Sequence, residues 1–85
     1  MSAGFRWIDW NLEHATKHGV NIWEIESVVR TANPRHEGDG KFRSIGRGQA
    51  GRWIQVIYIY DPDGTVFVIH ARPLTDAEKK RARRR

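Results

Sequence analysis

The side chains in this sequence that are best suited to catalysis are His70 and Arg72, near the end of the last predicted strand. Period-two alternation places both on one face of a strand predicted over residues 65–72, together with Val66 and Val68. Polar groups at the end of an apolar face are tolerable only where that face is open to solvent. An imidazole exchanges protons near neutral pH, and a guanidinium binds two phosphate oxygens at once. The pair therefore indicates phosphate chemistry, and the alternative is an exposed strand end with ordinary surface charge.

RNA cleavage by an internal 2′-hydroxyl is a reaction that these residue types suit. It requires a proton acceptor, a proton donor for the leaving oxygen, and cations around the pentacoordinate phosphate. His70 is the candidate acid or base, and Arg72 is the cation on which the catalytic prediction depends. The alternative for Arg72 is a structural ion pair with Glu78 or Asp76 that holds the last helix. The sequence offers further cations for phosphate at Arg52, Arg43 and Lys41.

Aromatic side chains accompany these cations in a strand predicted over residues 53–60. Trp53, Tyr58 and Tyr60 are suited to stacking on unpaired bases. The alternative is that they pack in the core, as aromatic residues of strands usually do. Alternation places Tyr58 and Tyr60 on one face and Trp53 on the other, so the three cannot act together.

The glycines Gly46, Gly48 and Gly51 match the G-x-G-x-x-G letters of a dinucleotide-binding fingerprint. That fingerprint requires a strand before it and a helix after it, so that the helix N-terminus meets the pyrophosphate. A predicted strand over 53–60 follows here instead. We interpret the glycines as a hairpin loop and expect no nucleotide cofactor.

His14 and His18 are four residues apart on a predicted helix and share one side of it, as a two-histidine metal site requires. Ala15 stands where zinc proteases carry their catalytic Glu, and no third ligand lies at a diagnostic spacing. The alternative for His18 is an interaction with unpaired carbonyls at the helix C-terminus. We therefore expect no metal.

The positive charge of this chain is concentrated at its end. The formal net charge is +5, and six of the last seven residues are basic. These six are Lys79, Lys80, Arg81, Arg83, Arg84 and Arg85. The other nine basic residues face ten acidic ones, so the body of the domain is nearly neutral. A basic tail over 79–85 is typical of contact with a phosphate backbone, and the alternative is a solvated helix end.

Length and composition limit the class of protein. Eighty-five residues are enough for a single domain over 1–85, and the absence of cysteine excludes disulfides and thiolate metal sites. No apolar run reaches the roughly 18 residues of a membrane span, and residues 1–11 lack the apolar stretch of a signal peptide. We expect a cytoplasmic protein that does not contact the membrane.

The helix signals predict three helices. Asp9 is the expected N-cap of a helix over 10–18 that Gly19 ends, and Asn21 is the expected N-cap of the second. The second helix carries an apolar stripe and stops at Asn33-Pro34. A Thr75-x-x-Glu78 capping box opens the last helix.

The strand signals predict four strands in the order β-α-α-β-β-β-α. The first is a short strand over 5–8, and residues 35–40 form a loop before the other three. Those three occupy 41–46, 53–60 and 65–72, with a turn at Asp61-Pro62-Asp63-Gly64 and a stop at Pro73. Short turns between consecutive strands imply a small antiparallel sheet with the helices packed on one face, an α+β architecture.

Several blocks of the sequence, in order, resemble the BrnT-type toxins of the RelE-like family. The resemblance runs from about residue 5 to residue 81. The blocks are Trp7-Ile-Asp-Trp-Asn-Leu-Glu-His14, Lys17-His-Gly-Val20, Ile45-Gly46, Gly51-Arg52, Ile69-His-Ala-Arg72 and Thr75-Asp-Ala-Glu78.

The resemblance implies a RelE-like fold and a metal-independent ribonuclease neutralised by a cognate antitoxin, usually of the ribbon-helix-helix type. It implies that Arg52 and Arg72 are the family's basic groups on the sheet, and that Glu78 is its carboxylate at the start of the last helix. Together with the residue chemistry, it leads us to expect catalytic roles for Arg72, Arg52, His70 and Glu78. The expected RNA-binding residues are Lys41, Arg43, Lys79, Lys80 and Arg81. The alternatives are a non-catalytic domain that binds nucleic acid and a domain that only binds an antitoxin.

Overall fold

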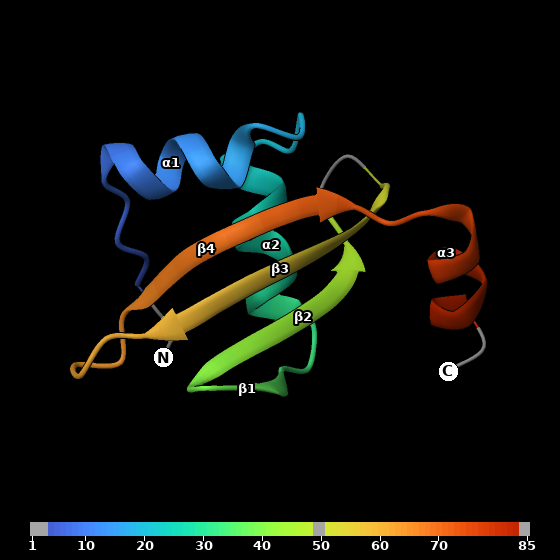
Figure 1. Cartoon of the computed structure of the whole chain (residues 1–85). Coiled ribbons are helices and arrows are strands. Elements are labelled where there is room, and N and C mark those ends of the chain that lie inside the picture. The colour runs from blue at the N-terminus through green and yellow to red at the C-terminus, as the bar shows by residue number, and fades with distance from the viewer. Residues whose placement is uncertain (1–3, 49–50, 84–85) are drawn as a thin grey trace.

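The computed structural model of this protein describes residues 4–48 and 51–83 (Figure 1). Within those residues the chain forms helices and strands in the order α-α-β-β-β-β-α. They are α1 (Asp9–Thr16), α2 (Ile22–Thr31), β1 (Arg35–Gly38), β2 (Lys41–Arg47), β3 (Trp53–Tyr60), β4 (Val66–Pro73) and α3 (Asp76–Arg83). The predicted α+β class with an antiparallel sheet is confirmed.

The strands form one antiparallel sheet in chain order, β1-β2-β3-β4 (Figure 1). β3 has the predicted bounds, because its run of β-branched and aromatic residues favours an extended chain. The predicted turn between β3 and β4 is also present. Gly64 adopts a φ of +88°, and its amide donates to the carbonyl of Asp61 over 2.9 Å.

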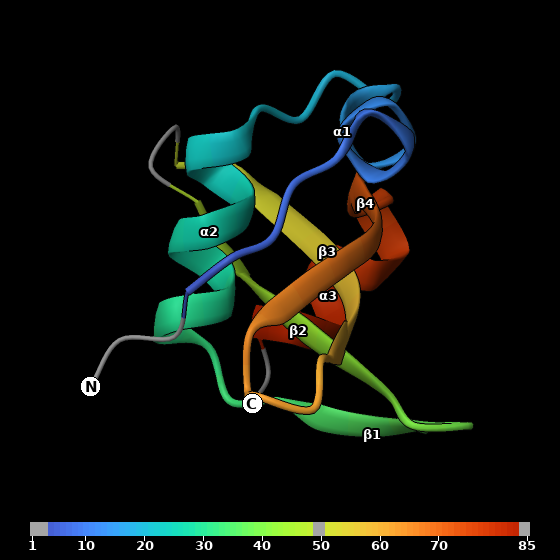
Figure 2. The same cartoon turned by 90° about the vertical axis from the view of Figure 1, so that its left-hand side faces the viewer.

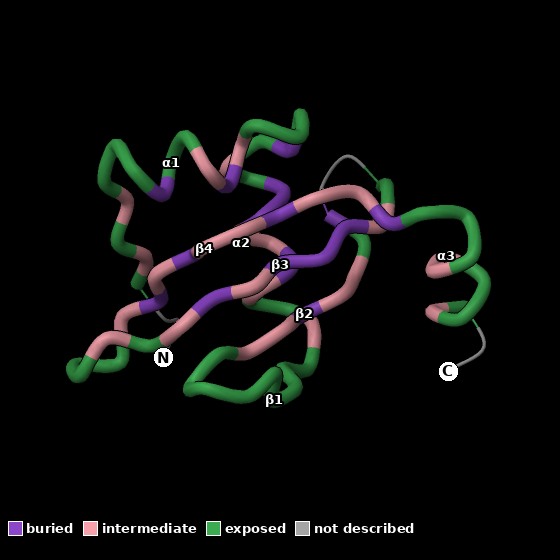
Figure 3. The backbone as a smooth tube through the Cα atoms, viewed as in Figure 1, coloured by how far each residue is buried: buried purple, intermediate pink, exposed green. Residues whose placement is uncertain are grey.

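The hydrophobic core lies between the sheet and the first two helices. α1 packs against β4, and α2 packs against β2 and β3 (Figure 2). The buried positions gather where these elements meet (Figure 3). The core residues are Ala15, Val20, Ile25, Val28, Ile54, Val56, Tyr58, Val66, Val68 and Ala71. We call the opposite side of the sheet, which α2 does not cover, the open face.

α2 begins and ends where its local signals predict. The side chain of Asn21 accepts a hydrogen bond from the amide of Glu24 over 2.9 Å, and the Glu24 carboxylate accepts from the amide of Asn21 over 3.1 Å. This reciprocal capping box satisfies two free amides at the helix start. Ile25 and Val28 of the predicted stripe are completely buried. The last residue of the helix is Thr31, two residues before Asn33-Pro34.

The strand predicted over residues 5–8 is wrong. Only Phe5 makes a bridge, and it is an isolated parallel bridge to Val66. The chain leaves the sheet because Asn11 is buried and accepts a hydrogen bond from the amide of Ile8 over 2.7 Å. That contact starts α1 with Ile8 in the N-cap position that we predicted for Asp9.

The loop predicted over residues 35–40 is also wrong. It contains β1, which pairs with β2 through Arg35 opposite Arg43 and His36 opposite Phe42. Every residue of β1 is exposed, so the strand has no apolar alternation that could reveal it.

A bulge in β4 changes which residues share a face. Ile57 pairs with His70, but the next residue, Tyr58, pairs with Val68, so Ile69 has no partner in the ladder. The expectation that Val66 and Val68 share a face with His70 and Arg72 is therefore wrong, because the extra residue shifts the alternation. His70 and Arg72 lie on the open face, and the two valines are in the core.

α3 differs from the other helices in having no buried residue. It lies beyond the end of β4, apart from α1 and α2 (Figure 1). The predicted capping box is present, since the Glu78 carboxylate accepts from the amide of Thr75 over 2.8 Å and the Thr75 hydroxyl accepts from the amide of Glu78 over 3.2 Å. Most of the predicted basic tail belongs to this helix, and residues 84–85 lie outside the described residues.

Candidate functional site

A row of side chains crosses the open face at right angles to the strands. The register places Arg35 of β1 opposite Arg43 of β2, Arg43 opposite Ile57 of β3, and Ile57 opposite His70 of β4. Neighbouring strands are about 4.8 Å apart, so Arg43 and His70 are separated by roughly 10 Å of sheet. The row therefore joins two arginines to a histidine on one surface.

The next row carries Arg72, whose guanidinium is held by Glu78 in a bidentate ion pair. Arg72 lies opposite Gln55 of β3. Its Nη1 and Nη2 donate to the two oxygens of Glu78, each over 2.8 Å, and Nη1 also donates to the carbonyl of Pro73 over 3.1 Å. The Arg72 hydrogen bond and the Thr75 amide lower the pKa of Glu78 to about 2, so its carboxylate is charged at neutral pH.

This ion pair leaves part of the Arg72 guanidinium available. A guanidinium has five N–H groups, and the hydrogen bonds to Glu78 and Pro73 use three of them. Among the described residues, no hydrogen bond engages the Nε–H or the second N–H of Nη2. Those two groups form one edge of the planar fork, which matches the spacing of two phosphate oxygens. Arg72 can therefore bind Glu78 and a phosphate at the same time.

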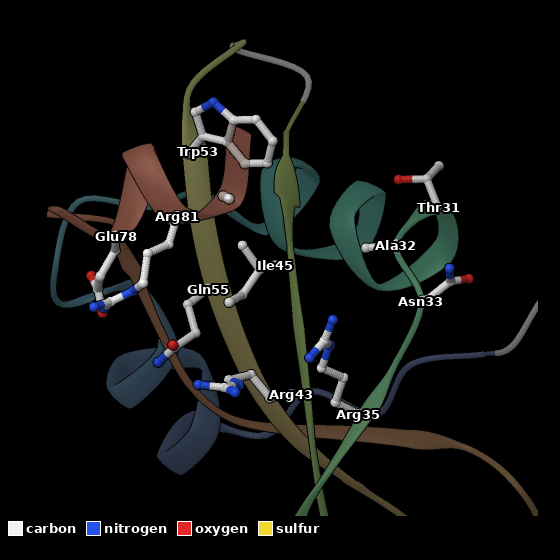
Figure 4. A pocket seen from close by; sticks show the side chains of 11 residues that line it. Thr31, Ala32, Asn33, Arg35, Arg43, Ile45, Trp53, Gln55, Glu78 and Arg81 are labelled. Carbon is white, nitrogen blue, oxygen red and sulfur yellow. The ribbon is translucent and has the colours of Figure 1, made fainter. Parts of the chain in front are cut away.

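A pocket of about 510 Å³ opens beside these rows (Figure 4). It is lined by Thr31, Ala32, Asn33, Arg35, Arg43, Ile45, Trp53, Gln55, Glu78, Arg81 and Ala82. Three of these lining residues are arginines, and the one carboxylate, Glu78, is already paired with Arg72. The pocket is thus suited to an anion, and it brings together Arg43, Glu78 and Arg81 of the predicted site.

Two buried nitrogen atoms at this pocket have no hydrogen-bond partner among the described residues, the Nε of Arg43 and the Nε1 of Trp53. The Arg43 Nε lies 3.2 Å from a carboxylate oxygen of Glu37, but without the geometry of a hydrogen bond. The guanidinium of Arg47 lies over the Trp53 ring, 5.5 Å from its centroid. Arg43 thus has a carboxylate nearby, whereas the Trp53 Nε1 is a buried donor without a partner. Such a donor is costly, so Trp53 favours an acceptor brought by a ligand.

His70 is half-buried on the open face, in surroundings that keep it neutral. Burial lowers its pKa, and the neighbouring His18, Arg72 and Lys17 lower the pKa further. The ring centroid of His18 lies 5.2 Å away, in an edge-to-face arrangement. A neutral imidazole next to a guanidinium is suited to accept a proton during phosphate chemistry.

Arg52 is not brought together with the other predicted catalytic residues. Its Nε and Nη2 donate to the two oxygens of Glu24, over 2.8 and 2.9 Å, and Nη2 also donates to the carbonyl of Gly19 over 2.6 Å. Glu24 is almost completely buried at the start of α2. Arg52 thus joins the turn before β3 to the helical layer, whereas Arg72 lies on the open face.

The predicted lysines are peripheral to the pocket. Lys41 is exposed at the start of β2, next to the hairpin with β1. Lys79 and Lys80 lie on α3, and the ammonium of Lys79 is 3.8 Å from a carboxylate oxygen of Asp76. They add positive charge around the open face and do not line the pocket.

Three features of this surface are not evident from the sequence: Arg35, Arg47 and the contact of His18 with His70. Arg35 was placed in a loop, because β1 carries no apolar pattern. His18 was interpreted only within its own helix. Its contact with His70 joins residues 52 positions apart, and no local spacing reveals such a contact.

Within 4–48 and 51–83, no three His, Cys, Asp or Glu side chains lie close enough together to hold a metal ion. No helix in the same part of the chain is long and apolar enough to cross a membrane. A second cavity of about 460 Å³ lies between α1 and α2, and none of its described lining residues is titratable.

Comparison with family models, with curated proteins and with solved structures found no match for this chain.

Proposed function

We propose that this protein is a metal-independent ribonuclease of the cytoplasm, the toxin of a toxin–antitoxin pair that a cognate antitoxin neutralises. The observation that carries the proposal is the row on the open face, in which Arg35 and Arg43 lead across Ile57 to His70, with Arg72 beside it. Guanidinium groups bind backbone phosphates, and a neutral imidazole can accept the proton of a 2′-hydroxyl. The row supplies both on one surface.

The pocket supports RNA as the substrate class. Its arginines suit a phosphate, and the ring of Trp53 offers a face on which an unpaired base can stack. Unpaired bases are accessible in single-stranded RNA and not in a duplex. We therefore propose single-stranded RNA as the substrate. The proposal that the partner is an antitoxin of the ribbon-helix-helix type rests on the resemblance of the sequence to BrnT-type toxins.

A non-catalytic protein of the same fold is the second candidate. It is favoured by the ion pairs of Arg52 and Arg72, since both arginines have structural partners in Glu24 and Glu78. Such a protein would bind nucleic acid, or an antitoxin, without cleaving RNA.

Substitution of His70 distinguishes the two candidate functions. We expect the purified wild-type chain to cleave single-stranded RNA in the presence of EDTA and to arrest growth when expressed alone. His70→Ala should lower the cleavage rate by about 10²- to 10⁴-fold, the usual contribution of a general base. His36→Ala is the matched control, because His36 is an exposed histidine of β1 that pairs with Phe42.

The measurement is the rate of RNA cleavage, with binding followed separately by fluorescence anisotropy. RNA binding by the wild type without cleavage, and without growth arrest, would favour the non-catalytic candidate. Equal cleavage by the wild type and His70→Ala would remove His70 from the proposed site.

A further inference from the structure

A second histidine faces His70 across the boundary between α1 and β4. The rings of His18 and His70 have centroids 5.2 Å apart and planes inclined by 68°. His18 is exposed in the turn after α1, and His70 is half-buried on the open face. Among the described residues, neither ring forms a hydrogen bond with a carboxylate that would engage its nitrogens.

We infer that His18 and His70 form a proton-transfer pair, in which His70 is the base and His18 is the acid of the cleavage reaction. This inference rests on the proposed function, because it names the second group that the reaction requires. RNA cleavage by a 2′-hydroxyl needs one group to accept a proton and another to donate one, and a single histidine cannot do both in the same step.

The turn that carries His18 is fixed by the residue that follows it. Gly19 adopts a φ of +82°, and its amide donates to the carbonyl of Thr16 over 3.0 Å. The carbonyl of Gly19 accepts a hydrogen bond from Arg52 over 2.6 Å. Arg52 therefore positions the turn that carries His18. It affects the proposed reaction through this turn, although Arg52 does not lie on the open face.

The roles within the pair follow from the surroundings of the two rings. The charged and titratable groups that face His70 are Lys17 and His18 next to α1, and Arg72 on its own strand. All of them oppose a positive charge on His70, so this ring is the one that enters the reaction neutral. His18 is the more exposed ring, and the role of the acid therefore falls to it.

The proposed step balances its atoms and charges. The 2′-oxygen forms a bond to phosphorus as its proton passes to His70. The bond from phosphorus to the 5′-oxygen breaks, its electron pair stays on that oxygen, and His18 gives the oxygen a proton. The products are a 2′,3′-cyclic phosphate and a 5′-hydroxyl. Arg72 contacts the non-bridging oxygens, where negative charge grows in the transition state.

The test uses the full chain, the variant His18→Ala and two substrates. One substrate is single-stranded RNA, whose 5′-oxygen must be protonated as it leaves. The other is a nucleoside 3′-phosphate esterified with nitrophenol, whose leaving group departs without a proton. His14→Ala is the matched control, because His14 lies one turn earlier on α1, with its ring stacked on Trp10 at a centroid distance of 4.2 Å.

We expect His18→Ala to cleave RNA about 10²- to 10⁴-fold more slowly than the wild type, and to cleave the nitrophenyl ester almost as fast. His14→Ala should resemble the wild type on both substrates.

Three results would overturn the inference. If His18→Ala cleaves RNA as fast as the wild type, His18 is not the acid, and the proposed function stands. If the variant cleaves both substrates more slowly by the same factor, His18 has a structural role only. If the wild type binds RNA but cleaves neither substrate, the proposed function fails together with the pair.

Discussion

Arg72 forms an ion pair with Glu78 and is also the arginine of the proposed catalytic site. Its ion pair with Glu78 is partly exposed, since the two side chains keep 30% and 23% of their accessible surface. Such pairs contribute little to stability, because water screens them. The bidentate geometry therefore matters more for the orientation of the guanidinium than for the stability of the fold.

We predict that Arg72→Ala and Arg72→Lys both lose RNA cleavage, by about 10²- to 10³-fold, which is typical of removing one preorganised donor. Lysine keeps the charge but not the planar fork, so it should not rescue the rate. Both variants should melt within roughly 8 °C of the wild type, because about 1 kcal/mol shifts the melting temperature of a domain this small by 4–8 °C. Cleavage rates and thermal melts measure the two effects separately.

Glu78→Gln separates the ion pair from the guanidinium itself, because it weakens the contact that orients Arg72 but keeps the arginine. Retained cleavage by Glu78→Gln shows that Arg72 acts on the RNA directly. Loss of cleavage as large as that of Arg72→Ala would mean that the ion pair, or Glu78 itself, carries the effect. A large fall in the melting temperature of Arg72→Ala with normal cleavage would assign Arg72 a structural role.

At the scale of elements, one turn holds the helical layer against the sheet. Gly48 lies so close to α2 that an added Cβ would be 3.2 Å from the Cα of Glu24. Arg52, in the same connection between β2 and β3, binds the Glu24 carboxylate and the carbonyl of Gly19. The start of α2, the turn after α1 and the start of β3 are therefore joined at one point.

We predict that Arg52→Ala destabilises the protein by about 2–3 kcal/mol. Removing one partner of a fully buried ion pair costs about 3–5 kcal/mol, and the cost is lower here because 42% of the Arg52 side chain is exposed. The melting temperature should fall by about 10–20 °C. Arg47→Ala is the control, because this exposed arginine over Trp53 should change stability by no more than about 0.5 kcal/mol.

Acid should reduce the effect of Arg52→Ala. The Arg52 hydrogen bond lowers the pKa of Glu24 in the folded protein, so the ion pair stabilises the fold fully above the pKa of an unfolded glutamate. That stabilisation is lost as the pH falls through the lowered value. Urea unfolding of both proteins from pH 7 downward should therefore give curves that converge in acid, and a constant difference would rule out the Glu24 carboxylate as the cause.

At the scale of the whole molecule, positive charge surrounds one surface of a nearly neutral body. The arginines of the open face come from β1, β2 and β4, and α3 adds the basic residues of the last turns. The described chain measures only 35 × 25 × 23 Å, so these groups are close enough to contact one stretch of RNA. Several phosphate contacts at once make binding depend strongly on salt.

We predict that the affinity for single-stranded RNA falls with salt at a log–log slope of about −2 to −4, as expected for roughly three to six phosphate contacts. The double variant Arg43→Ala and Arg81→Ala should reduce that slope by about 1.4, because each contact contributes about 0.7. Arg30→Ala, on exposed α2 surface, should leave the slope unchanged. Fluorescence anisotropy across salt concentrations tests this, and a flat response would point to a protein as the true partner.

Features whose causes lie within a few residues could be predicted from the sequence. The Asn21 cap, the bounds of β3 and the turn at Gly64 depend on local hydrogen bonds and backbone preferences, and all three are present as predicted. The direction of Arg72, away from the core, was also predictable, although the bulge at Ile69 interrupts the regular alternation of β4.

Contacts between distant side chains depend on the packing of the whole fold and could not be predicted from the sequence. The contacts of Arg52 with Glu24 and of His18 with His70 join residues 28 and 52 positions apart. β1 likewise exists because β2 offers it an edge, since none of its own residues is buried. Neighbouring residues set local backbone geometry, whereas the partners of an exposed arginine or histidine depend on how the whole sheet and its helices pack together.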